Sequence, residues 1–166
     1  MKKYTDFAHI HQRKEIENYV LDPSVIDRTL ARKIAEYNRR TDNNVTFSEK
    51  SEDILMQLTD SLKTKVSGQF LSKRAKYEQI KHSNLDSATI NQRLLEDFDN
   101  IWGSLSSRLK IVPGKDILPQ LNNYLQEKCS VTLSLGVTIA EMTLDEVSQE
   151  IRILIEQLDS FRTQDM

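Results

Sequence analysis

The longest helix that the sequence predicts runs from Ser51 to Lys81, SEDILMQLTDSLKTKVSGQFLSKRAKYEQIK. Its apolar side chains recur every three or four positions, the spacing of one helix face: Leu55, Leu58, Leu62, Val66 and Phe70. We expect Ser51 to cap this helix. A glycine in a helix interior costs about 1 kcal/mol relative to alanine, so we expect any bend or break at Gly68.

The next stretch predicts a second long helix that begins near Asp86 and closes at Trp102-Gly103. Its apolar positions follow the same spacing: Ile90, Leu94, Phe98 and Ile101. Each of the two helices has one apolar stripe that must be covered. We therefore expect them to pack as an antiparallel pair.

Before this pair, alternation over Tyr4–His11 favours a short strand, and residues 14–20 have helical spacing. Asp22 and Pro23 are a cap and a first helical residue, so they predict a helix over 23–38. Residues 39–46 are typical of a loop.

After the pair, the apolar run 109–112 suggests a short strand that ends at Pro113-Gly114. Lys115 begins a helix that tolerates Pro119 only in its opening turns. Residues 131–142 are ambiguous: alternation favours a strand at 131–135, whereas Ile139 and Met142 indicate a short helix. Residues 143–146, Thr-Leu-Asp-Glu, have the form of a capping box before a last helix over 147–161.

These elements predict a mainly α fold of about six helices, with a short N-terminal strand and candidate strands at 109–112 and 131–135. We expect residues 1–166 to form a single domain. It would comprise the strand and first short helix (1–23), the region of the long helical pair (24–105) and a C-terminal helical region (106–166). No apolar run approaches the roughly 18 residues of a membrane span, and the single Cys129 fits a reducing cytosol. We therefore expect a cytoplasmic protein.

Charge is unevenly distributed. Residues 1–115 hold 20 basic and 16 acidic side chains, whereas residues 116–166 hold 3 basic and 9 acidic ones. One interpretation is that these charges belong to solvated helix faces without a specific function. The functional interpretation is that residues 1–115 face a polyanion such as DNA. Six basic residues against one acid, Glu78, are candidates to border a phosphate backbone: Lys63, Lys65, Lys73, Arg74, Lys76 and Lys81.

Several kinds of chemistry are disfavoured. His9 and His11 lack the further Cys or His that would complete a zinc site. Cys129 has no evident base nearby, so we expect it to be buried or inert. Gly114-Lys115 resembles the end of a phosphate loop, but Asp116 stands where Ser or Thr is required.

Two short motifs remain. Glu15-Ile16-Glu17-Asn18-Tyr19 places two carboxylates at a strand–helix junction, where oxygen ligands suit Mg²⁺; the alternative is a pair of solvated acids. Pro113-Gly114-Lys115 aims a lysine and a helix N-terminus at one place, which favours anions; the alternative is an ordinary turn.

Residues 13–23, RKEIENYVLDP, resemble a stretch of the form R-x-E-I-E-N-Y-L-L-D-P in bacterial ATPase–nucleases with a C-terminal TOPRIM domain. These are the overcoming-lysogenisation-defect (OLD) family and its antiphage relatives. Residues 112–115, VPGK, resemble a later V-P-G-K segment of the same proteins. The resemblance is strongest at 7–30 and 109–161.

The resemblance implies Mg²⁺-dependent phosphodiester cleavage. Glu17 would be a metal ligand with Glu15 in support, and Lys115 would stabilise charge on the scissile phosphate. The family's upstream glutamate, its Asp-x-Asp pair and its ATPase portion have no counterpart in this sequence. We therefore expect the chain to be inactive alone and completed in cis or in trans.

Two alternatives stay open: a non-catalytic helical module that binds DNA through residues 63–81, and an interaction module that docks, or forms a homo-oligomer, through its acidic last helix.

Overall fold

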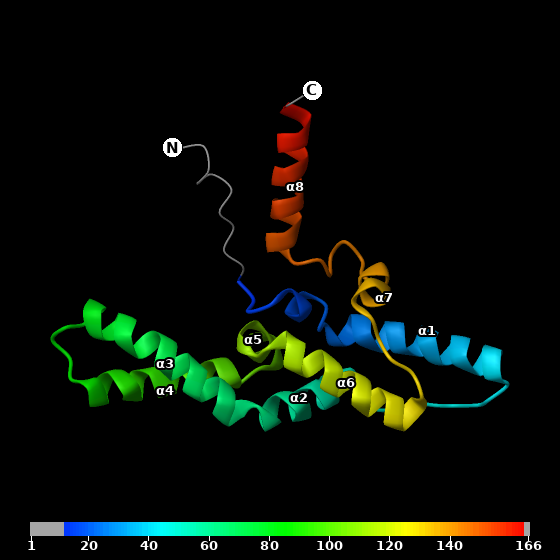
Figure 1. Ribbon diagram of the computed structural model, residues 1–166, viewed down its shortest axis with the longest axis horizontal. Helices are drawn as coiled ribbons and strands as arrows, with labels where there is room; N and C mark the ends of the chain where they lie inside the picture. The colour runs from blue at the N-terminus through cyan, green and yellow to red at the C-terminus, as the bar shows by residue number, and fades with distance from the viewer. Residues whose placement is uncertain (1–11, 165–166) are drawn as a thin grey trace.

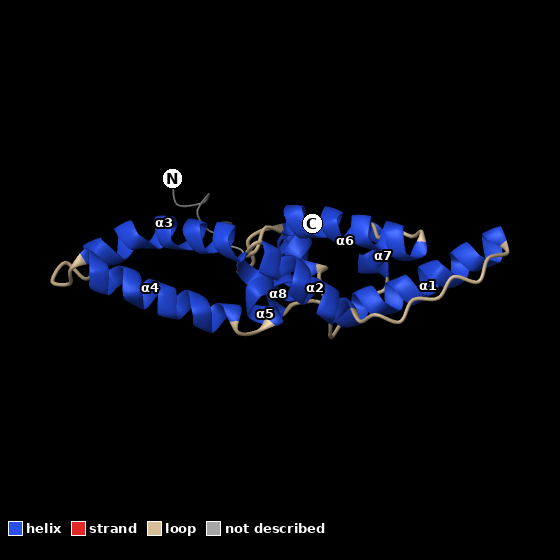
Figure 2. Cartoon of the chain, turned by 90° about the horizontal axis from the view of Figure 1, so that it is seen from below, coloured by secondary structure: helices blue, strands red, loops and turns tan. Residues whose placement is uncertain are grey.

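The computed structural model describes residues 12–164, and this part of the chain is mainly helical. A 3-10 helix and eight α-helices follow one another: η1 (Ile16–Tyr19), α1 (Pro23–Thr41), α2 (Ser51–Ser61), α3 (Lys63–Lys81), α4 (Ser87–Trp102), α5 (Leu105–Ile111), α6 (Gly114–Cys129), α7 (Leu135–Ala140) and α8 (Gln149–Gln164). No strand occurs between residues 12 and 164 (Figure 2). The strand expected at Tyr4–His11 lies outside the described residues.

The body is elongated (Figure 1). Helices α3 and α4 form an antiparallel hairpin at one end, as expected, and α1, α2 and α6 lie toward the other end. Aromatic rings join the hairpin to the centre: the ring centroids of Phe70 and Phe98 are 5.6 Å apart, and Phe98 stacks on Trp102 at 5.1 Å. Helix α8 projects from the body. None of the described helices is long and apolar enough to cross a bilayer.

The predicted start of α1 is confirmed, because the Asp22 carboxylate accepts hydrogen bonds from the Ser24 and Val25 amides and Pro23 opens the helix. The predicted cap of α2 is wrong. Ser51 is the first helical residue, and its amide donates to the carboxylate of Asp27 in α1 at 2.9 Å. A side chain from a neighbouring helix therefore satisfies this helix start.

The sequence allows a bend or break at Gly68, and the structure has no break there. The long helix is interrupted at Leu62, between α2 and α3, whereas Gly68 lies inside α3. The end of α2 is held from outside, because the Asp60 carboxylate accepts from Arg108 at 2.7 Å and from the Trp102 indole at 3.2 Å. Tertiary contacts override the weak helix propensity of glycine.

Both candidate strands in the C-terminal third are wrong. Residues 109–111 form the last turn of α5, whose first turn is capped by the Ser104 hydroxyl. Residues 131–134 are irregular, with Val131 and Leu133 buried. The Asn122 side chain takes the place of a partner strand: it donates to the Leu133 carbonyl at 2.9 Å and accepts from the Leu133 amide at 2.7 Å.

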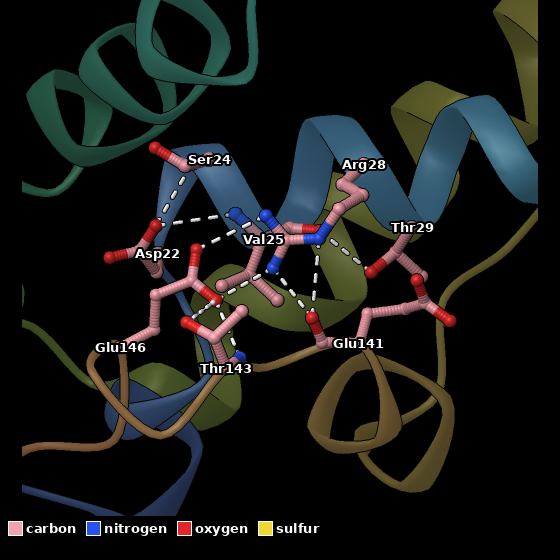
Figure 3. A network of polar contacts seen from close by, with 8 residues as sticks. All are labelled: Asp22, Ser24, Val25, Arg28, Thr29, Glu141, Thr143 and Glu146. Atoms are coloured by element: carbon pink, nitrogen blue, oxygen red, sulfur yellow. Dashed lines mark hydrogen bonds and ion pairs between the residues drawn. The ribbon is translucent and has the colours of Figure 1, made fainter.

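The capping box at 143–146 forms its backbone half, since the Thr143 amide donates to Glu146 Oε2 at 2.7 Å. It does not start the last helix, which begins at Gln149 rather than at 147. The Glu146 carboxylate instead pairs with Arg28 of α1 at 2.7 Å, and Arg28 also donates to the Glu141 carbonyl (Figure 3). This network attaches the segment after α7 to α1.

Candidate metal and phosphate site

The two motifs lie against each other, although more than 90 residues separate them in the chain. Asn18 of η1 is fully buried, and its side-chain amide donates to the carbonyls of Leu109 at 2.8 Å and Val112 at 3.0 Å. Its Oδ1 accepts from the Glu15 amide at 3.1 Å. One asparagine side chain thus provides hydrogen-bond partners for backbone groups at the end of α5 and at the start of η1.

Gly114 makes this approach sterically feasible. A Cβ atom added at Gly114 would lie 2.7 Å from Asn18 Oδ1 and 2.9 Å from Glu17 Cβ. Real Cβ atoms essentially never come this close to other heavy atoms. The glycine of the P-G-K turn is therefore a packing requirement of the contact with η1.

The first turn of α6 binds a carboxylate of the other motif. The Lys115 amide donates to Glu15 Oε2 at 2.8 Å. A helix N-terminus favours negative charge because its first amides lack partners within the helix. Glu15 therefore acts as a cap of α6 in this structure, a role that its position in the sequence does not indicate.

Glu17 differs from Glu15, since its Oε2 is buried and has no hydrogen-bond partner. A buried carboxylate oxygen without a donor is costly, and a cation would relieve that cost. The side chain of Lys115 is exposed at the start of α6. The structure thus brings together the backbone around all three predicted site residues.

The residues present fit a Mg²⁺ ion only in part. Mg²⁺ takes one or two protein carboxylates and completes its octahedron with phosphate oxygens and water. Glu17 offers an uncommitted oxygen, whereas Glu15 already accepts from α6. Residues 12–164 contain no group of three or more His, Cys, Asp or Glu side chains placed to hold a metal. Further ligands are needed for a two-metal site.

The six basic candidates are all exposed. Lys63 pairs with Asp99 at 3.2 Å, and Lys65 pairs with Asp116 of α6 at 2.6 Å. Lys73 and Arg74 line a cavity near η1. Lys81 lines a different hollow together with three acids: Glu78, Glu96 and Asp97. Lys76 lines neither of these two hollows.

Two features near the site escape sequence analysis. The carboxylate of Glu150 in α8 accepts from the Gln12 amide at 2.9 Å and from the Tyr19 hydroxyl. Burial, together with this hydrogen bond, raises the pKa of Tyr19. Lys14 donates to Gln69 of α3 at 2.8 Å, and burial lowers its pKa. No periodic pattern marks either residue, because both contacts join distant segments.

Cys129 is buried, as expected, and its thiol donates to the Leu125 carbonyl at 3.1 Å. Burial raises the pKa of this thiol. A protonated, buried thiol is a poor nucleophile. His9 and His11 lie outside the described residues.

No protein-family model matches this chain, and neither a curated protein nor a solved structure shows significant similarity to it.

Proposed function

We propose that this chain is the C-terminal helical portion of a TOPRIM-type, metal-dependent nuclease that resembles the OLD-type ATPase–nucleases of antiphage defence. In this proposal Glu17 supplies a ligand to Mg²⁺ and Lys115 contacts the scissile phosphate. The proposal is supported above all by the hydrogen bond from the Lys115 amide to Glu15. Two motifs that the resemblance assigns to one active site are adjacent, although nothing local in the sequence requires it.

The unpartnered oxygen of Glu17 supports its assignment as the metal ligand. Bound Mg²⁺ would activate water and neutralise charge on the phosphate. Lys115 would place its ammonium beside the same phosphate, where a fixed positive charge stabilises the charge that develops during cleavage. Glu15 orients the first turn of α6 through its hydrogen bond and so fixes the position of the Lys115 backbone, from which the side chain extends.

The chain is expected to be inactive alone, since two carboxylates cannot hold two metal ions. A portion that carries the Asp-x-Asp pair, in cis or in trans, would complete the site. We place this activity in the bacterial cytoplasm, where the reducing environment keeps a free thiol such as that of the buried Cys129 reduced.

Paramagnetic broadening of backbone amide signals by Mn²⁺ tests the metal ligand directly. Mn²⁺ should broaden the amides of residues 15–18 selectively, and Glu17→Gln should abolish that broadening. Glu52→Gln, which removes an exposed carboxylate in α2, is the matched control and should leave it unchanged. Broadening that is absent, or that survives Glu17→Gln, would refute the assignment.

A plasmid-nicking assay tests the expected dependence on a completing portion. The purified chain with Mg²⁺ should leave supercoiled plasmid intact. Nicking that Glu17→Ala abolishes would show that the chain is a complete nuclease and contradict this part of the proposal.

A further inference from the structure

A cavity of about 230 Å³ lies between the segment before η1, helix α3 and the end of α5. Five basic residues line it, and none of its described lining residues is acidic. They come from all three walls: Arg13, Lys14, Lys73, Arg74 and Lys110. The Lys14 amide donates to the Lys110 carbonyl at 3.0 Å, which fixes the two shorter walls to each other.

Lys14 lies among charges of both signs. Burial lowers its pKa, and nearby Lys73 and Lys65 lower it further, against Glu15 and Asp116, which raise it. Within the described part of the chain, neither Lys73 nor Lys110 has an ion pair. Such a cluster of cations repels itself and attracts a polyanion, whose binding offsets that repulsion.

The other five lining residues are two glutamines, Gln12 and Gln69, and three apolar side chains, and the apolar ones distinguish this cavity from a simple phosphate site. Val66, Phe70 and Ile111 line it alongside the cations. The guanidinium of Arg74 lies 4.3 Å from the centroid of the Phe70 ring. The volume is below the range of roughly 300–1,000 Å³ that holds drug-sized ligands, so a single flat ring system suits it better.

We propose that this cavity binds single-stranded nucleic acid, with one base against the apolar walls and the flanking phosphates on the cations. Cationic grooves with rings and guanidinium planes are how proteins hold unpaired strands. In a duplex the bases are stacked and paired and are not free to enter such a cavity. This inference rests on the proposed function, because it specifies that the nucleic acid bound next to Glu17 and Lys115 is single-stranded.

The cavity lies next to that site along the chain and in space. Lys14 immediately precedes Glu15, and Lys65 of α3 pairs with Asp116 in the first turn of α6 at 2.6 Å. A strand held by the cations would therefore run beside the start of α6.

Fluorescence anisotropy of a short labelled oligothymidine, measured in EDTA, tests the cavity without any metal. Lys73→Gln combined with Lys110→Gln should weaken binding roughly tenfold at low salt and lower the salt slope by about 1.4, the loss of two phosphate contacts. Lys50→Gln combined with Lys128→Gln makes the same charge change at two exposed sites and should have little effect. Circular dichroism confirms that both double variants are folded.

An oligomer with abasic sites tests the base contact with the protein unchanged. It should bind at least about fivefold more weakly than the intact oligomer, and duplex DNA should also bind more weakly. Equal affinities for intact, abasic and duplex probes would overturn the proposal, as would equal affinities of the two double variants.

The outcomes separate this inference from the metal site. If the oligomer binds as expected but Mn²⁺ broadening does not depend on Glu17, the cavity stands and the metal assignment falls. If the broadening depends on Glu17 but the cavity variant binds like its control, the reverse holds.

Discussion

Replacing Gly114 by alanine should destabilise this protein, although alanine is the better helix former. The added Cβ would lie 2.7 Å from Asn18 Oδ1, at least 0.7 Å inside the 3.4 Å at which ordinary contact begins. The backbone nitrogen of Asn18 would lie 3.0 Å from the same Cβ. Asn18 cannot retreat freely, because its side chain makes three hydrogen bonds in a fully buried setting.

The size of the effect follows from opposing contributions. Overpacking in a filled interior costs about 1–3 kcal/mol, and lengthening one of the buried hydrogen bonds of Asn18 costs about 1 kcal/mol more. The smaller entropy of the unfolded alanine chain offsets about 0.4–1 kcal/mol. The free energy of unfolding should therefore fall by about 1–3.6 kcal/mol.

Gly68→Ala is the matched control, since nothing lies within 4 Å of a Cβ added in the middle of α3. It should raise the free energy of unfolding by about 0.5–1 kcal/mol. Urea unfolding followed by circular dichroism at equal protein concentration measures both variants. If Gly114→Ala is as stable as the unmodified chain, or moves in the same direction as Gly68→Ala, the proposed contact between η1 and α6 is refuted.

Three further predictions concern buried or paired polar groups. Asn18→Ala leaves two buried carbonyls without donors and should lower the free energy of unfolding by about 2–4 kcal/mol in urea; a loss below that of an exposed-site variant would contradict it. The Arg28 ion pair lowers the pKa of Glu146 from 4.5 to about 2. The difference in unfolding free energy between the unmodified chain and Glu146→Gln should therefore be largest above pH 4.5 and disappear as the pH falls toward 2 in acid-unfolding curves. A difference that does not depend on pH would refute this prediction. Tyr19→Phe removes the donor to Glu150 and should speed hydrogen exchange in α8, whereas Tyr124→Phe should leave α8 unchanged; equal exchange in both would contradict the anchoring of α8 through Tyr19.

The expectation of docking or self-association through the last helix remains a prediction. Several large apolar side chains of α8 are exposed: Ile153, Ile155 and Leu158. These side chains of α8 are therefore not buried by packing against the other described residues.

Helices were predictable wherever the signal is local. The cap at Asp22, the start of a helix near Asp86 and the apolar stripes of the α3–α4 pair involve residues within one or two turns of each other, so the sequence contains them directly. The strands predicted at 109–112 and 131–135 do not form, because an apolar run or an alternating pattern reports burial and not hydrogen bonding. The backbone of Leu133 bonds to the Asn122 side chain rather than to another strand.

The candidate site divides in the same way. Local patterns are enough to predict a mainly helical chain and the two motifs that contain Glu17 and Lys115, because periodicity and motif spacing are properties of neighbouring residues. Three arrangements depend on tertiary packing: Gly114 packs on Asn18, Glu15 caps α6, and five cations from three segments line one open cavity. Those contacts join residues as many as 100 positions apart, and their energies depend on distances that no local pattern encodes.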